Sequence, residues 1–162
     1  GEIMTDYNKC NLSINALPEW LTWLKEPLEL NGVGVTTFNL PAGKGYTFMH
    51  SHEEQEEVYI ILSGKGIIQL EDEALNLVAG DFVRVSPPVR RAIKADNEAS
   101  MAGIIVGGVT KVGYSRYKGS SSLIDDGIPD WEDLPPWCEE NEKIVEINKK
   151  LKAQREAIKT AG

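Results

Sequence analysis

The chain has 162 residues, of which 41% are hydrophobic and 26% are charged. This is the composition of an ordinary globular protein, and the length is sufficient for one domain with a substantial core. The formal net charge of −8 argues against nucleic acid and against an anionic membrane surface as partners.

Three further sequence features indicate the cellular compartment of the protein. No stretch reaches the roughly 18 to 20 apolar residues that span a bilayer, and the first residues lack the basic and then apolar run of a signal peptide. Cys10 and Cys138 form neither a C-x-x-C pair nor a disulfide framework. We therefore expect a cytoplasmic protein with two free thiols.

Residues 1–31 are predicted to be an N-terminal segment with a short helix. The run from Asn15 to Leu24 has a proline near its start followed by a glutamate, which is a helix start signal. Trp20, Trp23 and Leu24 are spaced i, i+3, i+4 and would share one helix face. We expect that face to pack against the main domain.

Residues 32–112 show short runs rich in Val, Ile, Thr and Phe, separated by Gly, Pro, Asn and Asp. Such runs predict about eight strands, at roughly 33–40, 45–51, 57–63, 66–70, 74–78, 82–86, 91–95 and 101–109. Turns are predicted between them, including one at Ser63–Gly66. Closely spaced strands without intervening helices indicate an antiparallel sandwich or barrel.

Residues 113–162 are predicted to be an irregular connection followed by an amphipathic helix. Gly, Ser, Asp and Pro dominate as far as about residue 136. From about residue 138, Ile144, Ile147, Leu151 and Ile158 form an apolar stripe at helical spacing. We expect this helix to pack on its own barrel or on a partner subunit.

His50 and His52 are the two histidines of the chain and lie in one predicted strand. Side chains at i and i+2 of a strand point to the same face. Two imidazoles on one face, with carboxylates soon after them in the sequence, form a donor set for a divalent metal. The pattern therefore predicts a metal site, although no third histidine is present to complete it.

The residues around this pair resemble the cupin family. Gly45-x4-His50-x-His52-x4-Glu57-x6-Gly64 is similar to the first cupin motif, with one residue fewer between the first Gly and the first His. The stretch from Gly80-Asp81 to Arg91 is similar to a degraded second motif, with Pro in its turn where the family has Gly. The resemblance covers roughly residues 33–109 and implies an all-β, double-stranded β-helix barrel, here with flanking N- and C-terminal helices.

By position, the resemblance implies that His50, His52 and Glu57 are metal ligands, with Glu56 as the alternative carboxylate. Such a set suits Fe, Mn, Ni, Zn or Cu and leaves coordination positions open for substrate or O₂. The odd spacing between His52 and Glu57 requires a bend or bulge over residues 53–55.

Arg91 stands where the cupin motif has its last histidine. Arginine stays protonated and has no acceptor lone pair, so it cannot ligate a cation. One alternative is that Arg91 holds an anionic substrate beside a three-ligand metal. The other is that Arg91 pairs with Glu57 or Glu56, so that a salt bridge replaces the metal.

Other residues of the motif are candidates for the ligand-binding cavity. Tyr46 and Tyr59 are expected to line it with a polar tip, although tyrosines in barrels often only pack. Gln55 is a candidate extra oxygen ligand. Trp131 and Trp137 are expected to cover an apolar patch or, alternatively, to cap the mouth of the barrel.

The sequence leaves three functional hypotheses. The first is a metal-dependent enzyme acting on a small polar or anionic molecule, and the second is a barrel that binds or senses a small metabolite, with or without metal. The third is a metal-free barrel whose role is assembly. The missing fourth ligand favours the second over the first. Small cupins commonly dimerise, so the resemblance also implies a homodimer.

Overall fold

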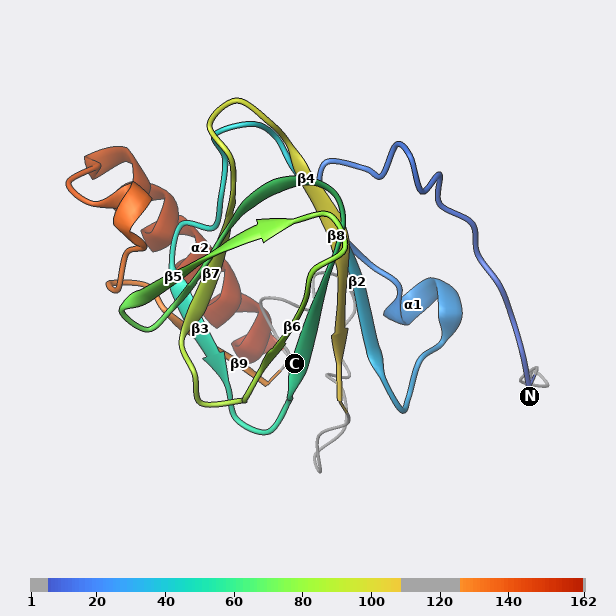
Figure 1. Ribbon diagram of the computed structural model, residues 1–162. Coiled ribbons are helices and arrows are strands. Elements are labelled where there is room, and N and C mark those ends of the chain that lie inside the picture. The colour runs from blue at the N-terminus through green and yellow to red at the C-terminus, as the bar shows by residue number, and fades with distance from the viewer. Residues whose placement is uncertain (1–5, 109–125, 162) are drawn as a thin grey trace.

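A computed structural model describes residues 6–108 and 126–161 of the chain (Figure 1). Nine strands form one curled antiparallel sheet of order β1-β2-β8-β4-β7-β3-β9, and β5 and β6 also pair with β4. The strands are β1 (Trp20–Trp23), β2 (Gly34–Leu40), β3 (Met49–His52), β4 (Glu57–Leu70), β5 (Glu73–Val78), β6 (Phe82–Val85), β7 (Arg91–Ala95), β8 (Met101–Gly107) and β9 (Gly127–Asp130). The helices are α1 (Lys25–Leu28), the 3-10 turn η2 (Pro136–Cys138) and α2 (Glu142–Ala161). The double-stranded β-helix predicted from the sequence is confirmed.

Strand β4 joins the two halves of the barrel. One half contains β1, β2, β6 and β8, and the other contains β3, β5, β7 and β9. Residues 57–64 of β4 pair with β8, residues 65–70 pair with β5, and residues 66–70 pair with β7. The predicted turn at Ser63–Gly66 is wrong, because the chain continues through it as strand. The glycines there allow close approach instead: a Cβ atom on Gly64 would collide with the carbonyl oxygen of Ser100, and one on Gly66 with that of Lys94.

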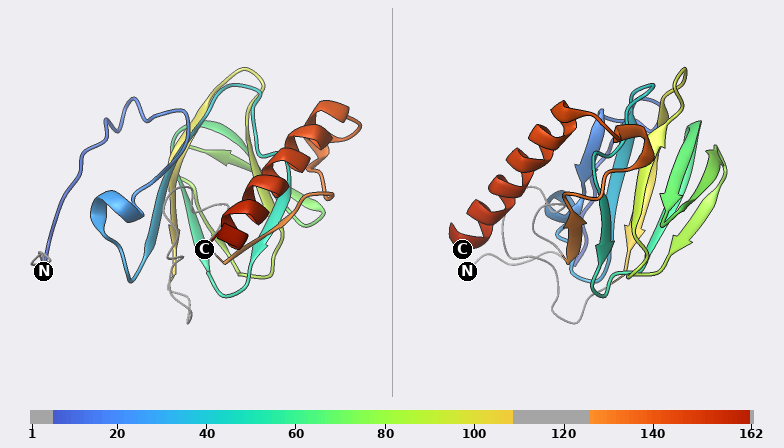
Figure 2. Two further views of the ribbon diagram at one scale, coloured as in Figure 1. Left: turned by 180° about the vertical axis from the view of Figure 1, so that it is seen from behind. Right: turned by 90° about the vertical axis from the view of Figure 1, so that its left-hand side faces the viewer.

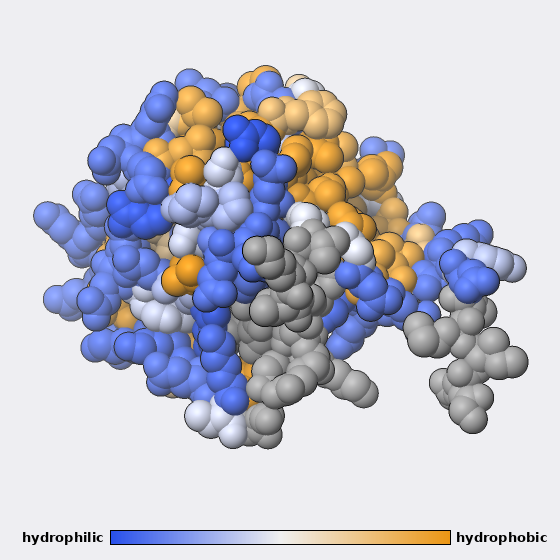
Figure 3. Space-filling model, turned by 90° about the horizontal axis from the view of Figure 1, so that it is seen from below, coloured by the Kyte–Doolittle hydropathy of each residue, from blue (hydrophilic) through white to orange (hydrophobic). Residues whose placement is uncertain are grey.

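The hydrophobic core lies between the two halves. Its fully buried members come from strands of both, among them Phe38, Ile61, Ile68 and Ile93. Alternation along each strand places these side chains inside and their neighbours outside. On the outside, seen from below, hydrophilic side chains cover one side of the molecule and apolar ones gather on another (Figure 3).

The helix predicted over residues 15–24 is wrong. Residues 20–23 form the edge strand β1, which pairs with β2 from Trp20↔Asn39 to Trp23↔Thr36. The helix that follows is the four-residue α1. Hydrogen bonding to the free edge of β2 stabilises this stretch as a strand more than its helical spacing favours a helix. Tryptophan and threonine are also residues that favour strands.

Helix α2 lies against the side of the barrel that carries β3 and β9 (Figure 2). Its most buried side chains are polar: Asn148 Nδ2 donates to the carbonyls of Thr47 (2.8 Å) and Trp131 (3.2 Å), and Arg155 Nη2 donates to that of Gly127 (2.6 Å). The predicted amphipathic helix is therefore present, but polar anchors add to its apolar stripe. Among the described residues, no helix is long and apolar enough to cross a bilayer.

Candidate metal centre and its cavity

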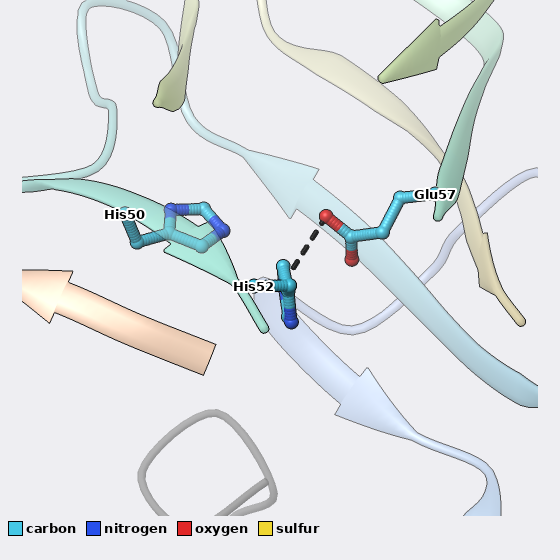
Figure 4. A group of neighbouring side chains, drawn as sticks. All are labelled: His50, His52 and Glu57. Carbon is cyan, nitrogen blue, oxygen red and sulfur yellow. Dashed lines mark ion pairs between the residues drawn. The ribbon is translucent and has the colours of Figure 1, made fainter. Parts of the chain in front are cut away.

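Three candidate ligands meet between the two halves of the barrel. His50 and His52 project from β3, and Glu57 is the first residue of β4. The chain bends at residues 53–54 between these strands, so the predicted bend is confirmed. One nitrogen or oxygen atom from each of the three residues lies within 4.8 Å of the others. Figure 4 shows the three side chains converging.

Of the two adjacent carboxylates, Glu56 and Glu57, only that of Glu57 lies beside the two histidines. Its side chain is buried, and its Oε1 lies 3.3 Å from His52 Nε2. Glu56 is exposed and forms an ion pair with Arg84 at 3.2 Å. Residues 56 and 57 point to opposite faces of the sheet, as neighbours along extended chain do.

Arg91 is fully buried and contacts Glu57. Its Nη2 and Nε donate to Glu57 Oε1 at 2.9 and 3.2 Å, and Nη1 donates to the carbonyls of Pro87 (3.0 Å) and Val89 (2.6 Å). The hydroxyl of Tyr59 donates to the same carboxylate oxygen at 3.1 Å. Of the two alternatives for Arg91, the structure thus shows the salt bridge to Glu57.

The charges of the cluster shift the pKa values of its members. Burial raises the pKa of Glu57, but the hydrogen bond and charge of His52 and the charge of Arg91 outweigh it and hold that pKa at about 2. Burial lowers the pKa of His50 to about 3, with Glu57 opposing the shift. At neutral pH the carboxylate is therefore ionised and the imidazole of His50 is neutral, which are the forms that bind metals.

Sequence reasoning missed Asp126, which fixes the orientation of His52. Asp126 Oδ1 lies 2.8 Å from His52 Nδ1, and its Oδ2 accepts hydrogen bonds from the backbone N–H groups of Glu54 (3.0 Å) and Gln55 (2.8 Å). Such a carboxylate leaves Nε2 of the imidazole to face the metal position. No local spacing marks Asp126, because it lies 74 residues after His52.

A cavity of about 660 Å³ opens beside the three ligands. His50, His52 and Glu57 line it together with Tyr46, Gln55 and Tyr59, so all the predicted cavity residues except Arg91 reach it. The rest of the wall is largely apolar and includes Trp20, Leu21, Trp23, Phe48, Ile105, Ile147 and Leu151.

Trp131 and Trp137 support the cavity wall from behind. The ring of Trp131 packs on Phe48 with centroids 4.6 Å apart, and Trp137 Nε1 donates to the carbonyl of Tyr46 at 2.8 Å. Neither tryptophan lines the cavity; Trp20 and Trp23 do. The alternative in which Trp131 and Trp137 cap the mouth is therefore wrong.

Comparisons with known proteins agree with this geometry. The profile of the Cupin domain matches residues 36–107. A cupin protein from Bacteroides fragilis is 32% identical, with a TM-score of 0.60 over 72% of this chain and 92% of that one. An uncharacterized protein of Methanocaldococcus jannaschii is 29% identical over 57% of this chain and 74% of its own length.

A more distant structure, described as a candidate sugar phosphate isomerase from Acidithiobacillus ferrooxidans, is 25% identical. Its TM-score is 0.50, over 56% of this chain and 58% of that one. The strand order, the placement of the two histidines and the glutamate, and the similarity to the Bacteroides protein agree: the chain belongs to the cupin family.

Proposed function

We propose that this cupin binds a divalent transition metal through His50, His52 and Glu57 and takes up a small molecule in the adjoining cavity. The observation that carries the proposal is the convergence of these three donors within 4.8 Å on a cavity wall. Two imidazole nitrogens and one carboxylate suit Fe, Mn, Ni, Zn or Cu. The two carboxylates of Glu57 and Asp126 outnumber the one guanidinium of Arg91. This excess of negative charge also favours binding of a cation.

The surrounding residues fit this role. Asp126 orients His52, while Arg91 and Tyr59 hold one oxygen of Glu57. A metal bound by three protein ligands would act as a Lewis acid and keep positions for donor atoms of the small molecule. The chain's own part is to fix the ligand set and to exclude water through its apolar wall.

A metal-free binding barrel is the second candidate, and the Arg91–Glu57 ion pair favours it. The guanidinium supplies positive charge to the cluster where the cupin motif has a metal-binding histidine. A fixed cation near the site weakens metal affinity by Coulomb repulsion. Both candidates use the same cavity, and they differ in whether His50 and His52 hold a metal.

Metal content separates the two candidates. The full chain is purified without a tag, reconstituted, and analysed by inductively coupled plasma mass spectrometry beside His50→Ala/His52→Ala and Glu57→Gln. Near-stoichiometric metal that both variants lose supports the metal site. Glu56→Gln is the matched control, because its carboxylate pairs with Arg84 outside the cluster. Absence of metal from the reconstituted wild type supports the metal-free barrel.

Other expectations remain predictions. The homodimer is measured by sedimentation velocity, and the cytoplasmic location by fractionation of cells. The reaction class, if the cavity is catalytic, depends on the ligand that it accepts.

A further inference from the structure

We infer that the cavity selects a molecule with an apolar body and one metal-binding head of oxygen or nitrogen donors, rather than a sugar phosphate or another small anion. The inference rests on the proposed function, because it places the head at His50, His52 and Glu57. It goes beyond that function by naming the chemical class of the ligand.

Much of the apolar wall comes from elements outside the matched cupin domain. Trp20 and Trp23 belong to β1, and Ile147 and Leu151 belong to α2, whereas the domain match spans residues 36–107. We call these four residues the apolar collar. They stand on elements that approach the barrel from both ends of the chain. A cavity wall of aromatic and aliphatic groups gains binding free energy from apolar surface, not from charge.

Trp20 carries a conformational cost at this wall. Its φ of 67° lies in the left-handed region, which bulky residues rarely adopt. The residue is also 45% exposed although it lines the cavity. Strained backbone and a partly exposed indole at a cavity are features of positions that contact ligands.

Apart from a bound metal ion, the cavity offers little positive charge to an anionic ligand. A phosphate group carries nearly two negative charges at neutral pH and is usually held by arginine or lysine. Arg91 does not line the cavity, and its guanidinium donates to Glu57 and to two backbone carbonyls. Among the described lining residues, Lys25 is the one lysine or arginine, while Glu57 adds negative charge.

The test compares ligands that share a head but differ in the body. Calorimetry measures the affinity of zinc-loaded protein, under nitrogen, for catechol, naphthalene-2,3-diol and glucose 6-phosphate. The second ring should tighten binding of the diol about five- to tenfold, since it adds buried apolar area. Glucose 6-phosphate should bind more weakly than either diol. Equal affinity for the two diols, or tighter binding of the sugar phosphate, overturns the inference.

A matched pair of variants locates the effect on the apolar collar. Ile147 and Val145 are similarly exposed on α2, at 43% and 40%, but only Ile147 lines the cavity. Ile147→Asn should remove most of the preference for the naphthalene diol, and Val145→Asn should keep it. Equal effects of the two substitutions on the preference contradict a role of the collar.

Failure of the metal site is distinguishable from failure of the collar. If the protein takes up no zinc, the same comparison uses 2-naphthol and phenol with metal-free protein. A preference for 2-naphthol that Ile147→Asn abolishes supports the collar while the metal proposal falls. Equal affinity for 2-naphthol and phenol overturns the collar as well.

Discussion

Arg91 donates two hydrogen bonds to a single oxygen of Glu57, from Nε at 3.2 Å and Nη2 at 2.9 Å. The guanidinium is fully buried, and its Nη1 donates to the carbonyls of Pro87 and Val89. Arg91 therefore does two things at once. It holds the carboxylate that faces the metal position, and it closes the turn that leads into β7.

Arg91→Met should destabilise the fold. Removing one partner of a buried ion pair costs about 3–5 kcal/mol, because the other charge stays buried without compensation. Urea unfolding at neutral pH measures the loss. Arg84→Met is the control, since Arg84 pairs with Glu56 while 62% exposed and such pairs contribute about 0–1 kcal/mol. Equal losses for the two variants would mean that the Arg91–Glu57 pair adds nothing to stability.

Arg91→His should instead raise the metal affinity of the folded protein. The substitution removes a fixed positive charge beside the three ligands and supplies a fourth donor where the cupin motif has its histidine. We expect zinc to bind at least about tenfold more tightly, equivalent to about 1.4 kcal/mol. Competition with a chromophoric chelator measures the affinity. An unchanged value would place the metal away from residue 91.

Asp126→Asn should weaken metal binding without removing a metal ligand. The carboxylate fixes the ring of His52 through Nδ1, and loss of such a partner typically costs about 10- to 100-fold in affinity. The same chelator competition measures it. Asp133→Asn serves as the control, because Asp133 pairs with Arg90 outside the cluster. If both aspartate variants bind zinc like the wild type, Asp126 does not orient the ligand.

The predictable part of the site lies within one short stretch. His50, His52 and Glu57 span eight residues of sequence, so strand alternation and the cupin motif were enough to bring them together. Asp126 joins them from 74 residues beyond His52, and Arg91 reaches Glu57 across 34 residues. The second motif offers the Arg91–Glu57 pair only as one of two alternatives, and nothing in the sequence marks Asp126. Both contacts depend on how strands distant in the sequence pair.

The errors in the fold have a similar origin. The spacing of Trp20 and Trp23 fits a helix, but the open edge of β2 binds this stretch as a strand. The glycines at 64 and 66 are typical of a turn, yet here they let β4 pass close to neighbouring backbone. In both cases a tertiary contact outweighs the local preference of the sequence.

Gly64→Ala should destabilise the protein more than Gly80→Ala, although both glycines have positive φ, at 75° and 97°. The shared conformational cost of placing a side chain there is about 1–2 kcal/mol. At Gly64 the new methyl group would also collide with the carbonyl of Ser100, whereas nothing lies within 4 Å of it at Gly80. We therefore expect losses of about 3–5 kcal/mol for Gly64→Ala and about 1–2 kcal/mol for Gly80→Ala in urea unfolding. Similar losses of stability at the two positions would show that the backbone around Gly64 and Ser100 shifts readily to make room for a methyl group. Close backbone approach would then not be what requires glycine at residue 64.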